Sequence, residues 1–177
     1  MRRGKKIGLY VGLMVLLTGI LAGCKGSGTQ KEPAVEDILK AVQEAYGADY
    51  LPDTDLDEEM MSQFLGIDMS MADSFAAQMP MNGVHPDRVV IAKAAEGKGD
   101  ELEEELLALK TRLQGDELIY PINIAKTEAA QVVRKGDYAA FFLVGAVDMR
   151  DDATEEEQLT FAQDEVKKAV DAFESCF

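Results

Sequence analysis

Residues 129–147, AAQVVRKGDYAAFFLVGAV, decide the expected fold of this chain. Two runs rich in valine, phenylalanine and tyrosine flank Lys135-Gly136-Asp137, a pattern that predicts a β-hairpin turning at this glycine. Residues 74–97, SFAAQMPMNGVHPDRVVIAKAAEG, have the same plan, with a turn signal at Asn82-Gly83 inside a loop longer than two residues. The sequence therefore predicts two hairpins.

An amphipathic helix is expected after each hairpin. Residues 99–115 carry leucines at helical spacing, and residues 154–173 carry a comparable apolar stripe. Each helix is predicted to begin with a capping box, Asp100 with Glu103 and Thr154 with Glu157. The hairpins also share an Ala-Ala-Gln motif, at 76–78 and 129–131. The predicted order is therefore strand–strand–helix, twice.

Further helices are expected before the first hairpin. Residues 33–47 place their apolar side chains on one helical stripe. Residues 51–66 are predicted as a loop and a short helix, with Asp55 and Glu58 as its capping box. Residues 117–128 are predicted as an irregular crossing segment. Together these elements predict an α+β fold: a four-stranded antiparallel sheet from two strand–strand–helix units, with helices on one face and the additional N-terminal helices at its edge or end.

The N-terminus has the layout of a secretory signal. Four basic residues lie within residues 1–6, and residues 7–23 are uncharged and mostly apolar. The motif Leu21-Ala22-Gly23-Cys24 resembles the bacterial lipobox at all four positions, which implies a diacylglyceryl thioether on Cys24 and cleavage before it. The alternative is an uncleaved anchor, because the apolar run is near the lower limit of about 17 residues for a spanning helix. Either hypothesis places the rest of the chain outside the cytoplasmic membrane.

This assignment divides the chain into a signal peptide (1–23), a lipidated cysteine with a flexible tether (24–33) and a single α+β domain (34–177). Loss of residues 1–23 would change the formal charge from −15 to −19, because they hold four basic and no acidic residues. So acidic a domain is not expected to bind nucleic acid; the charge favours solubility or attraction to cationic partners. With Cys24 lipidated, Cys176 has no partner for an internal disulfide, and it is expected to be a partly buried small hydrophobe.

The chain resembles a family of uncharacterised lipoproteins, mainly from Gram-positive bacteria, that carry one domain of unknown function. The matching segments are DILKAVQEAYGADYLPD, AAQMPM, VVIAKA, YPINIAK and VVRKGDYAAFFLVG, which run in that order from about Asp37 to Gly145. The resemblance implies an extracytoplasmic location, a lipid anchor and an α+β domain. It implies no activity and therefore no catalytic residue. His85-Pro86 in the first hairpin loop departs from the family pattern.

Catalytic motifs are scarce. The only histidine, His85, lies in a turn and is expected to be an ordinary exposed loop residue rather than a general base. There is no G-x-S-x-G motif, and the chain has too few cysteines and histidines for a zinc site. Residues 53–59, DTDLDEE, alternate carboxylates but depart from the calcium-loop template, so they favour a helix-capping loop. Residues 148–157 are expected to be a solvated acidic helix start rather than a weak divalent-ion site.

The methionines offer the one candidate metal site. Met69, Met71, Met79 and Met81 form two pairs spaced by two, which on an extended chain would place each pair of thioethers on one face. Thioethers select Cu(I), and His85 could join them. The alternatives are that these methionines fill irregular core gaps or line an adaptable binding groove.

The sequence thus predicts a membrane-anchored extracytoplasmic lipoprotein whose domain is a non-catalytic binding or interaction module. An envelope protein or a small ligand is the expected partner, and no cofactor is expected besides the covalent diacylglyceryl lipid on Cys24. Two other classes stay open: a methionine-rich Cu(I)-handling envelope protein, and a cell-envelope enzyme that uses carboxylates.

Overall fold

The computed structural model of the protein describes residues 32–82 and 85–177, and residues 32–177 form one compact unit. Several predictions fall outside the described residues: the signal peptide 1–23 with its motif Leu21, Ala22 and Gly23, the lipidation of Cys24, and all of the tether up to residue 31. The turn signal at Asn82-Gly83 is described only in part. The described residues make up nearly all of the predicted domain, 34–177.

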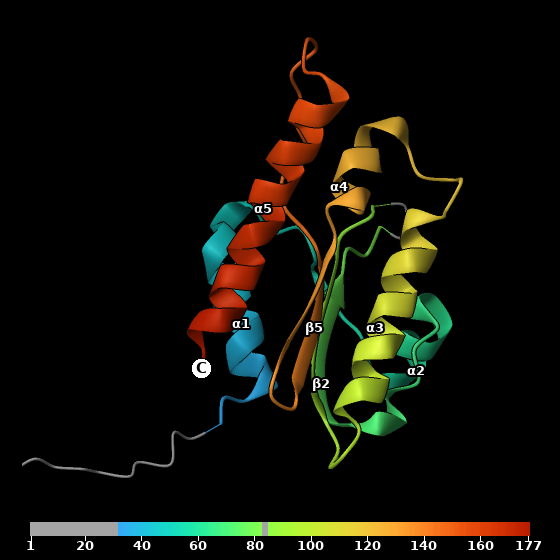
Figure 1. The fold of residues 1–177 in the computed structure, drawn as a ribbon, viewed down its shortest axis with the longest axis vertical. Coiled ribbons are helices and arrows are strands. Elements are labelled where there is room, and N and C mark those ends of the chain that lie inside the picture. The colour runs from blue at the N-terminus through green and yellow to red at the C-terminus, as the bar shows by residue number, and fades with distance from the viewer. Residues whose placement is uncertain (1–31, 83–84) are drawn as a thin grey trace, which may run out of the picture. The chain divides into compact units, whose positions relative to one another are not determined.

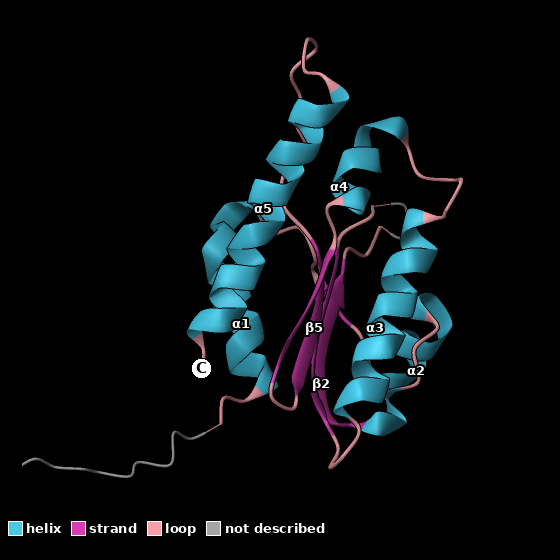
Figure 2. Ribbon diagram, in the orientation of Figure 1, coloured by secondary structure: helices cyan, strands magenta, loops and turns pink. Residues whose placement is uncertain are grey.

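The domain has a five-stranded antiparallel sheet with strand order β1-β2-β3-β5-β4. Figure 2 shows the strands at its centre, between the helices. The two predicted hairpins are confirmed. The prediction of four strands is wrong by one, because a two-residue strand extends the sheet beside the end of β2. The strands are β1 (Thr54–Asp55), β2 (Ala72–Met79), β3 (Arg88–Ala94), β4 (Gln131–Lys135) and β5 (Tyr138–Leu143).

Helices cover both faces of this sheet, whereas the sequence predicted helices on one face only. Figure 1 shows α1 and α5 on one side of the strands and α2 and α3 on the other. The two strand–strand–helix units are present, but their helices α3 and α5 pack on opposite faces. The α-helices are α1 (Val35–Tyr46), α2 (Glu58–Met60, continued by a π turn, Met61–Leu65), α3 (Gly99–Gln114), α4 (Ile124–Glu128) and α5 (Glu155–Ser175).

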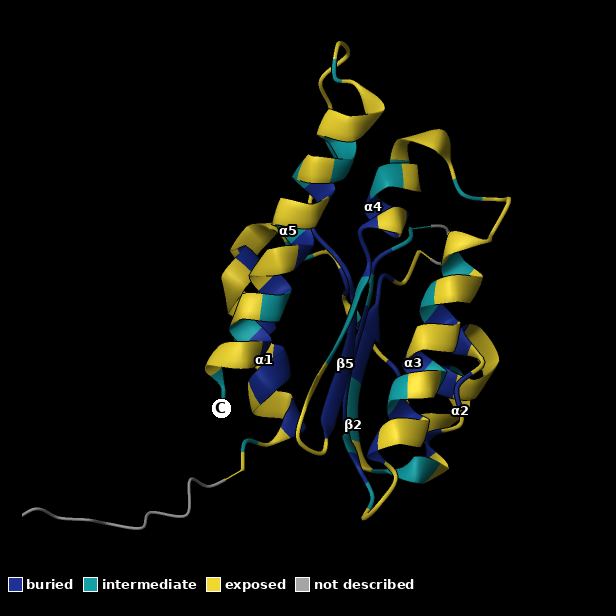
Figure 3. Ribbon diagram, in the orientation of Figure 1, coloured by how far each residue is buried: buried dark blue, intermediate teal, exposed yellow. Residues whose placement is uncertain are grey.

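Two hydrophobic cores result, one on each face of the sheet. Alternate residues of β3 and β5 point into each core, so every residue of β5 is buried, as is the centre of β3 (Figure 3). Strands buried on both faces form continuous apolar runs rather than alternating ones. The continuous apolar run Ala139–Val144 therefore indicated a sheet that is covered on both faces. The face under α1 and α5 buries Val89, Ile91, Ala140 and Phe142; the face under α2 and α3 buries Val90, Ala92, Phe141 and Leu143.

Of the three predicted capping boxes, one forms and two do not. Thr154 and Glu157 form the predicted box at α5. Asp57, rather than Asp55, caps α2 by accepting the N–H of Met60. Asp55 lies in β1 instead, where it accepts a hydrogen bond from the Gln78 side chain. At α3 no side chain caps the helix; its predicted cap and box residues, Asp100 and Glu103, both bind the guanidinium of Arg134.

The segment predicted as irregular also contains helix. A 3-10 turn, Pro121–Asn123, leads directly into α4. Pro121 supplies the fixed φ that suits the first position of a helical turn. Elsewhere in the described chain, 3-10 turns occur at Gly47–Asp49 after α1 and at Met69–Met71 before β2.

The two ends of the sheet differ. At one end, here called the hairpin end, β4 and β5 are joined by Gly136 and Asp137, and Gly136 has the positive φ of 61° that such a two-residue turn requires. The domain also begins here, because the hydroxyl of Tyr138 donates to the carbonyl of Pro33 at 2.8 Å. At the other end, here called the loop end, longer connections meet: residues 80–87, 115–123 and 144–154 (Figure 1).

Candidate functional site

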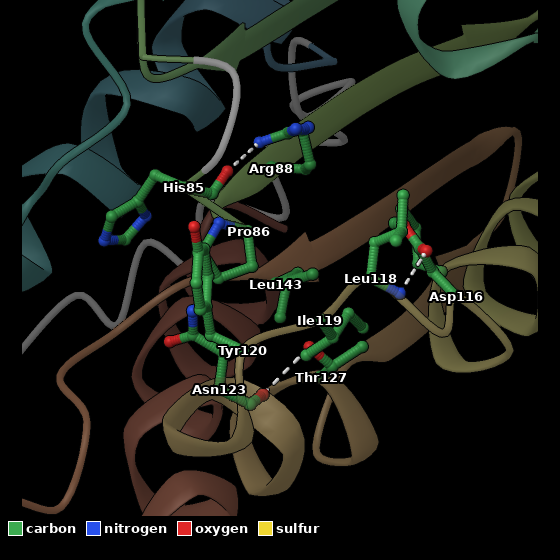
Figure 4. Close-up of a pocket in the computed structure, with 11 residues that line it drawn as sticks. His85, Pro86, Arg88, Asp116, Leu118, Ile119, Tyr120, Asn123, Thr127 and Leu143 are labelled. Atoms are coloured by element: carbon green, nitrogen blue, oxygen red, sulfur yellow. Dashed lines mark hydrogen bonds between the residues drawn. The ribbon is translucent and has the colours of Figure 1, made fainter.

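A pocket of about 230 Å³ lies at the loop end of the sheet (Figure 4). Two connections, two strand ends and one residue each from α3 and α4 build it. The loop between β2 and β3 forms one wall, the connection from α3 to α4 forms another, and the first residue of β3 and the last of β5 contribute to its base. The lining residues are His85, Pro86, Arg88, Leu113, Asp116, Leu118, Ile119, Tyr120, Asn123, Thr127 and Leu143.

The pocket wall combines apolar side chains with a few polar groups. Some of these polar groups are already engaged. The Asp116 carboxylate accepts the N–H of Leu118 at 2.9 Å, and the Thr127 hydroxyl donates to the carbonyl of Asn123 at 3.0 Å. Within the described part of the chain, the Tyr120 hydroxyl and the Asn123 side-chain amide have no hydrogen-bond partner. These two groups are therefore open to a ligand.

Exposed apolar side chains continue from the pocket along the connection to α4. Leu118 is 88% exposed and Tyr120 is 59% exposed, and Ile122 and Ile124 are also exposed. These four residues alternate in sequence and are here called the apolar rim. Of the nine large hydrophobic residues that are exposed in the described chain, four thus fall within seven positions. An exposed apolar patch of this kind marks an interaction site more often than a plain surface does.

A buried charge cluster lies beside the pocket. Asp87 is 0% exposed and forms an ion pair with Lys126 of α4, which is 4% exposed. The Nδ1 atom of His85 lies 3.2 Å from the Asp87 carboxylate. The guanidinium of Arg88 donates to the backbone carbonyls of His85 and Asp87, each at 2.6 Å. The cluster therefore ties the loop before β3 to α4.

Burial dominates the electrostatics of this ion pair. It raises the pKa of the Asp87 carboxyl and lowers the pKa of the Lys126 ammonium, although each charge opposes the shift of the other. Apart from their mutual contact, the buried Asp87 oxygens and the Lys126 Nζ atom have no well-formed hydrogen bond in the described structure. Because both groups are enclosed, a ligand in the pocket cannot reach the Lys126 nitrogen. The pair fixes the position of α4 rather than offering a reactive group.

The structure does not bring the methionines proposed for Cu(I) into one cluster. Met69 is buried in the core, and Met71 packs against that core before β2 begins. Met79 ends the strand, so it lies on the order of 25 Å from Met71 at the rise of a β-strand. Met81 is exposed beyond the strand end. Three of the four thus contribute to core packing.

His85 is one-third exposed and contacts Asp87, and in Figure 4 its imidazole points away from Ile119 and Leu143. It is remote from the Met69 end of β2, which lies at the hairpin end. Within residues 32–82 and 85–177, no group of three or more histidine, cysteine or acidic side chains is arranged to hold a metal ion. Over the same residues, no helix is long and apolar enough to cross a bilayer. Cys176 is partly buried, as expected, and burial raises the pKa of its thiol.

The sequence analysis predicted neither the pocket nor the buried ion pair between Asp87 and Lys126. The signal for the pair was a lysine that is the only charged residue of the mostly apolar stretch YPINIAK, and an aspartate directly before a strand that has no acidic residue. A charged residue in such a setting is expected to be buried with a partner. The signal for the apolar rim was the set of large hydrophobic residues in a segment that lacked the periodicity of a core element.

A family model described as a domain of unknown function, DUF4358, matches residues 45–144. This range contains all five strands, every residue that lines the pocket, and both members of the buried ion pair. No curated protein and no solved structure matches the chain. The expected resemblance to a family with one domain of unknown function is confirmed by this match.

Proposed function

The chain belongs to the DUF4358 family, and we propose that it is a non-catalytic binding module held on the outer face of the cell membrane by a lipid on Cys24. The observation that supports binding is the apolar rim beside the pocket. Four large apolar side chains within seven positions stay in water there, whereas the other five exposed ones are scattered over the described chain. Covering them would remove apolar surface from water, which is favourable.

The chemistry of the pocket favours binding over covalent catalysis. Its histidine has a neighbouring carboxylate, Asp87, and such a pair typically activates a serine, cysteine or threonine nucleophile. Among the described lining residues the hydroxyls belong to Tyr120 and Thr127. Thr127 is buried and donates to a backbone carbonyl. The groups that remain free suit hydrogen bonding to a bound partner.

The anchor rests on the sequence and needs a direct test. Cells that express the protein should incorporate an alkyne-bearing fatty acid into it, and Cys24→Ala should remove the label. Cys176→Ala is the matched control and should keep the label, because the chain holds no other cysteine. Protease added to intact spheroplasts should degrade the domain. Labelling that persists in Cys24→Ala would remove the lipid anchor from this proposal.

The binding role can be tested with a photo-crosslinking amino acid in place of an exposed aromatic residue. Tyr120 in the apolar rim is 59% exposed, and Phe64 in the π turn after α2 is 58% exposed. We expect p-benzoylphenylalanine at position 120 to give discrete crosslinked products in intact cells, and the same probe at position 64 to give few. Equal crosslinking at both positions, or none at position 120, would contradict a dedicated binding surface at the loop end.

A further inference from the structure

We infer that the pocket receives one apolar side chain of a polypeptide segment, and that this segment carries lysine or arginine next to the inserted residue. This inference rests on the proposed binding function and names its partner class. It follows from the size of the pocket, the polar groups left open in its wall, the charges around it and its place in the domain.

The size of the pocket fits a side chain better than a whole small molecule. Sites for drug-sized ligands usually enclose about 300–1,000 Å³ and bury most of the ligand. The pocket here measures about 230 Å³ and opens directly onto the apolar rim. A single leucine, methionine or phenylalanine side chain could enter it. The rest of the partner would then lie over Leu118, Tyr120 and Ile122, as an anchor residue does in protein interfaces.

The open polar groups match a peptide backbone. The Asn123 amide can donate to a carbonyl and accept from an N–H, and the Tyr120 hydroxyl can do either. Both lie at the pocket wall without a partner in the described structure. A polypeptide presents such donors and acceptors on each side of an inserted side chain, whereas an acyl chain presents none.

Within residues 115–128 the exposed charged side chains are all acidic. Asp116, Glu117 and Glu128 are exposed, and the one basic residue between positions 115 and 128 is Lys126, whose charge is buried against Asp87. The connection and α4 together thus present three negative charges and four exposed apolar side chains. Complementary charge attracts a partner and discriminates against others, so the segment is basic.

The position of the pocket argues for a partner protein rather than the bilayer. The domain begins at the hairpin end, where Pro33 contacts Tyr138, which pairs with Lys93 of β3. The pocket includes Arg88 and Leu143, which pair five positions further along the same strands. These two pairs are separated by about 17 Å at the rise of a strand. The pocket therefore opens at the end of the sheet opposite the one where the described chain enters the domain.

The inference can be tested by panning a random dodecapeptide phage library against the full-length chain in detergent micelles. Leu118→Ser and Leu107→Ser serve as parallel baits; both leucines are exposed, but Leu107 lies on α3 outside the rim. We expect enriched peptides to contain a large apolar residue within three positions of lysine or arginine. A resynthesised peptide should bind Leu118→Ser at least tenfold more weakly, and should bind Leu107→Ser as it binds the unaltered chain. Replacing the apolar residue of the peptide by serine should cost a similar factor.

Enrichment of acidic peptides, of peptides that bind Leu118→Ser unchanged, or of no peptide would overturn the inference. The crosslinking at position 120 separates this failure from failure of the proposed function. If discrete crosslinked products form in cells while the peptide test fails, the surface binds a partner of another class, and the mass of the adduct distinguishes a lipid from a protein. If no product forms, the binding function itself is wrong.

Discussion

The two ends of the sheet differ in the length of their connections and in where charged and apolar side chains lie. At the hairpin end the connection between β4 and β5 is two residues long, and the contacts between charged side chains, such as Lys93 with Glu32, are at the surface. At the loop end the connections are long, a carboxylate and an ammonium are buried together, and apolar side chains face water. At the hairpin end these charged groups are thus exposed, as is usual. At the loop end a charged pair is buried and apolar side chains are exposed.

This difference shows where the domain keeps an exposed apolar surface at a cost in folding stability. A buried ion pair rarely stabilises a fold more than a well-packed apolar pair would, and exposed leucine and isoleucine forgo the gain from burial. Both features occur within the family-matched residues and next to one pocket. The contrast between the two ends is therefore open to direct measurement.

The largest effect is expected from Lys126→Met, at the loop end. The substitution leaves the Asp87 carboxyl buried without its cation, which should lower the free energy of unfolding by about 3–5 kcal/mol. Urea unfolding followed by circular dichroism measures this change. The double variant Asp87→Leu with Lys126→Met is the matched control and should recover most of the loss. If the double variant is no more stable than Lys126→Met, the ion pair is not the source of the effect.

A pH dependence should follow from the same pair. In the folded chain the pKa of the Asp87 carboxyl is raised above its ordinary value of 3.8. Between 3.8 and the raised pKa the folded chain binds more protons than the unfolded chain, so stability falls as pH rises through that window. The pKa of Lys126 is lowered below 10.5, so stability falls as pH drops from 10.5 through the lowered value. Relative to the double variant, the unaltered chain should therefore be least stable between the two windows. Unfolding free energies at pH 4, 7 and 10 test this, and a difference that is constant with pH would contradict it.

A smaller effect is expected at the hairpin end. Tyr138→Phe removes the hydrogen bond to the Pro33 carbonyl while keeping the buried ring, so the loss of stability should be about 0.5–1.5 kcal/mol. The same unfolding experiment measures it. A loss comparable to that of Lys126→Met would show that the two ends do not differ as described.

The smallest effect on stability is expected from Leu118→Ser in the apolar rim. The side chain is 88% exposed, so the free energy of unfolding should change by no more than about 0.5 kcal/mol. The same substitution should reduce the crosslinked products formed from position 120. A loss of stability above about 1 kcal/mol would indicate that the rim is part of the fold rather than a surface held for a partner.

The sequence predicted the elements whose signal is local. The stripe of α1, from Val35 to Tyr46, is buried as expected, and the Thr154 capping box forms. Both depend on residues that are close in the chain. The hairpin at Gly136 was predicted for the same reason, because the turn needs a residue that tolerates positive φ.

Features set by distant contacts were not predicted. The strand Thr54–Asp55 forms only because Met79 and Gln78 lie beside it, and Asp100 binds Arg134 because β4 passes the start of α3. The Asp87–Lys126 pair joins residues 39 positions apart. The pocket depends on two connections, β2 to β3 and α3 to α4, that converge only after the sheet has formed. None of these partners can be identified from local periodicity, which explains why the helices and hairpins were predicted and the candidate site was not.

The two cores are completed at different points along the chain. The core under α2 and α3 is built from residues between Leu56 and Leu143. The core under α1 and α5 also needs Ala162, Val166, Ala169 and Phe173 from the last helix. In a chain that emerges N-terminus first, whether from a ribosome or a translocation channel, the core under α2 and α3 can form before α5 has emerged. The core under α1 and α5 can form only afterwards. Loss of α5 would thus leave a half-finished domain with Ile91 and Phe142 uncovered, a natural target for quality-control proteases.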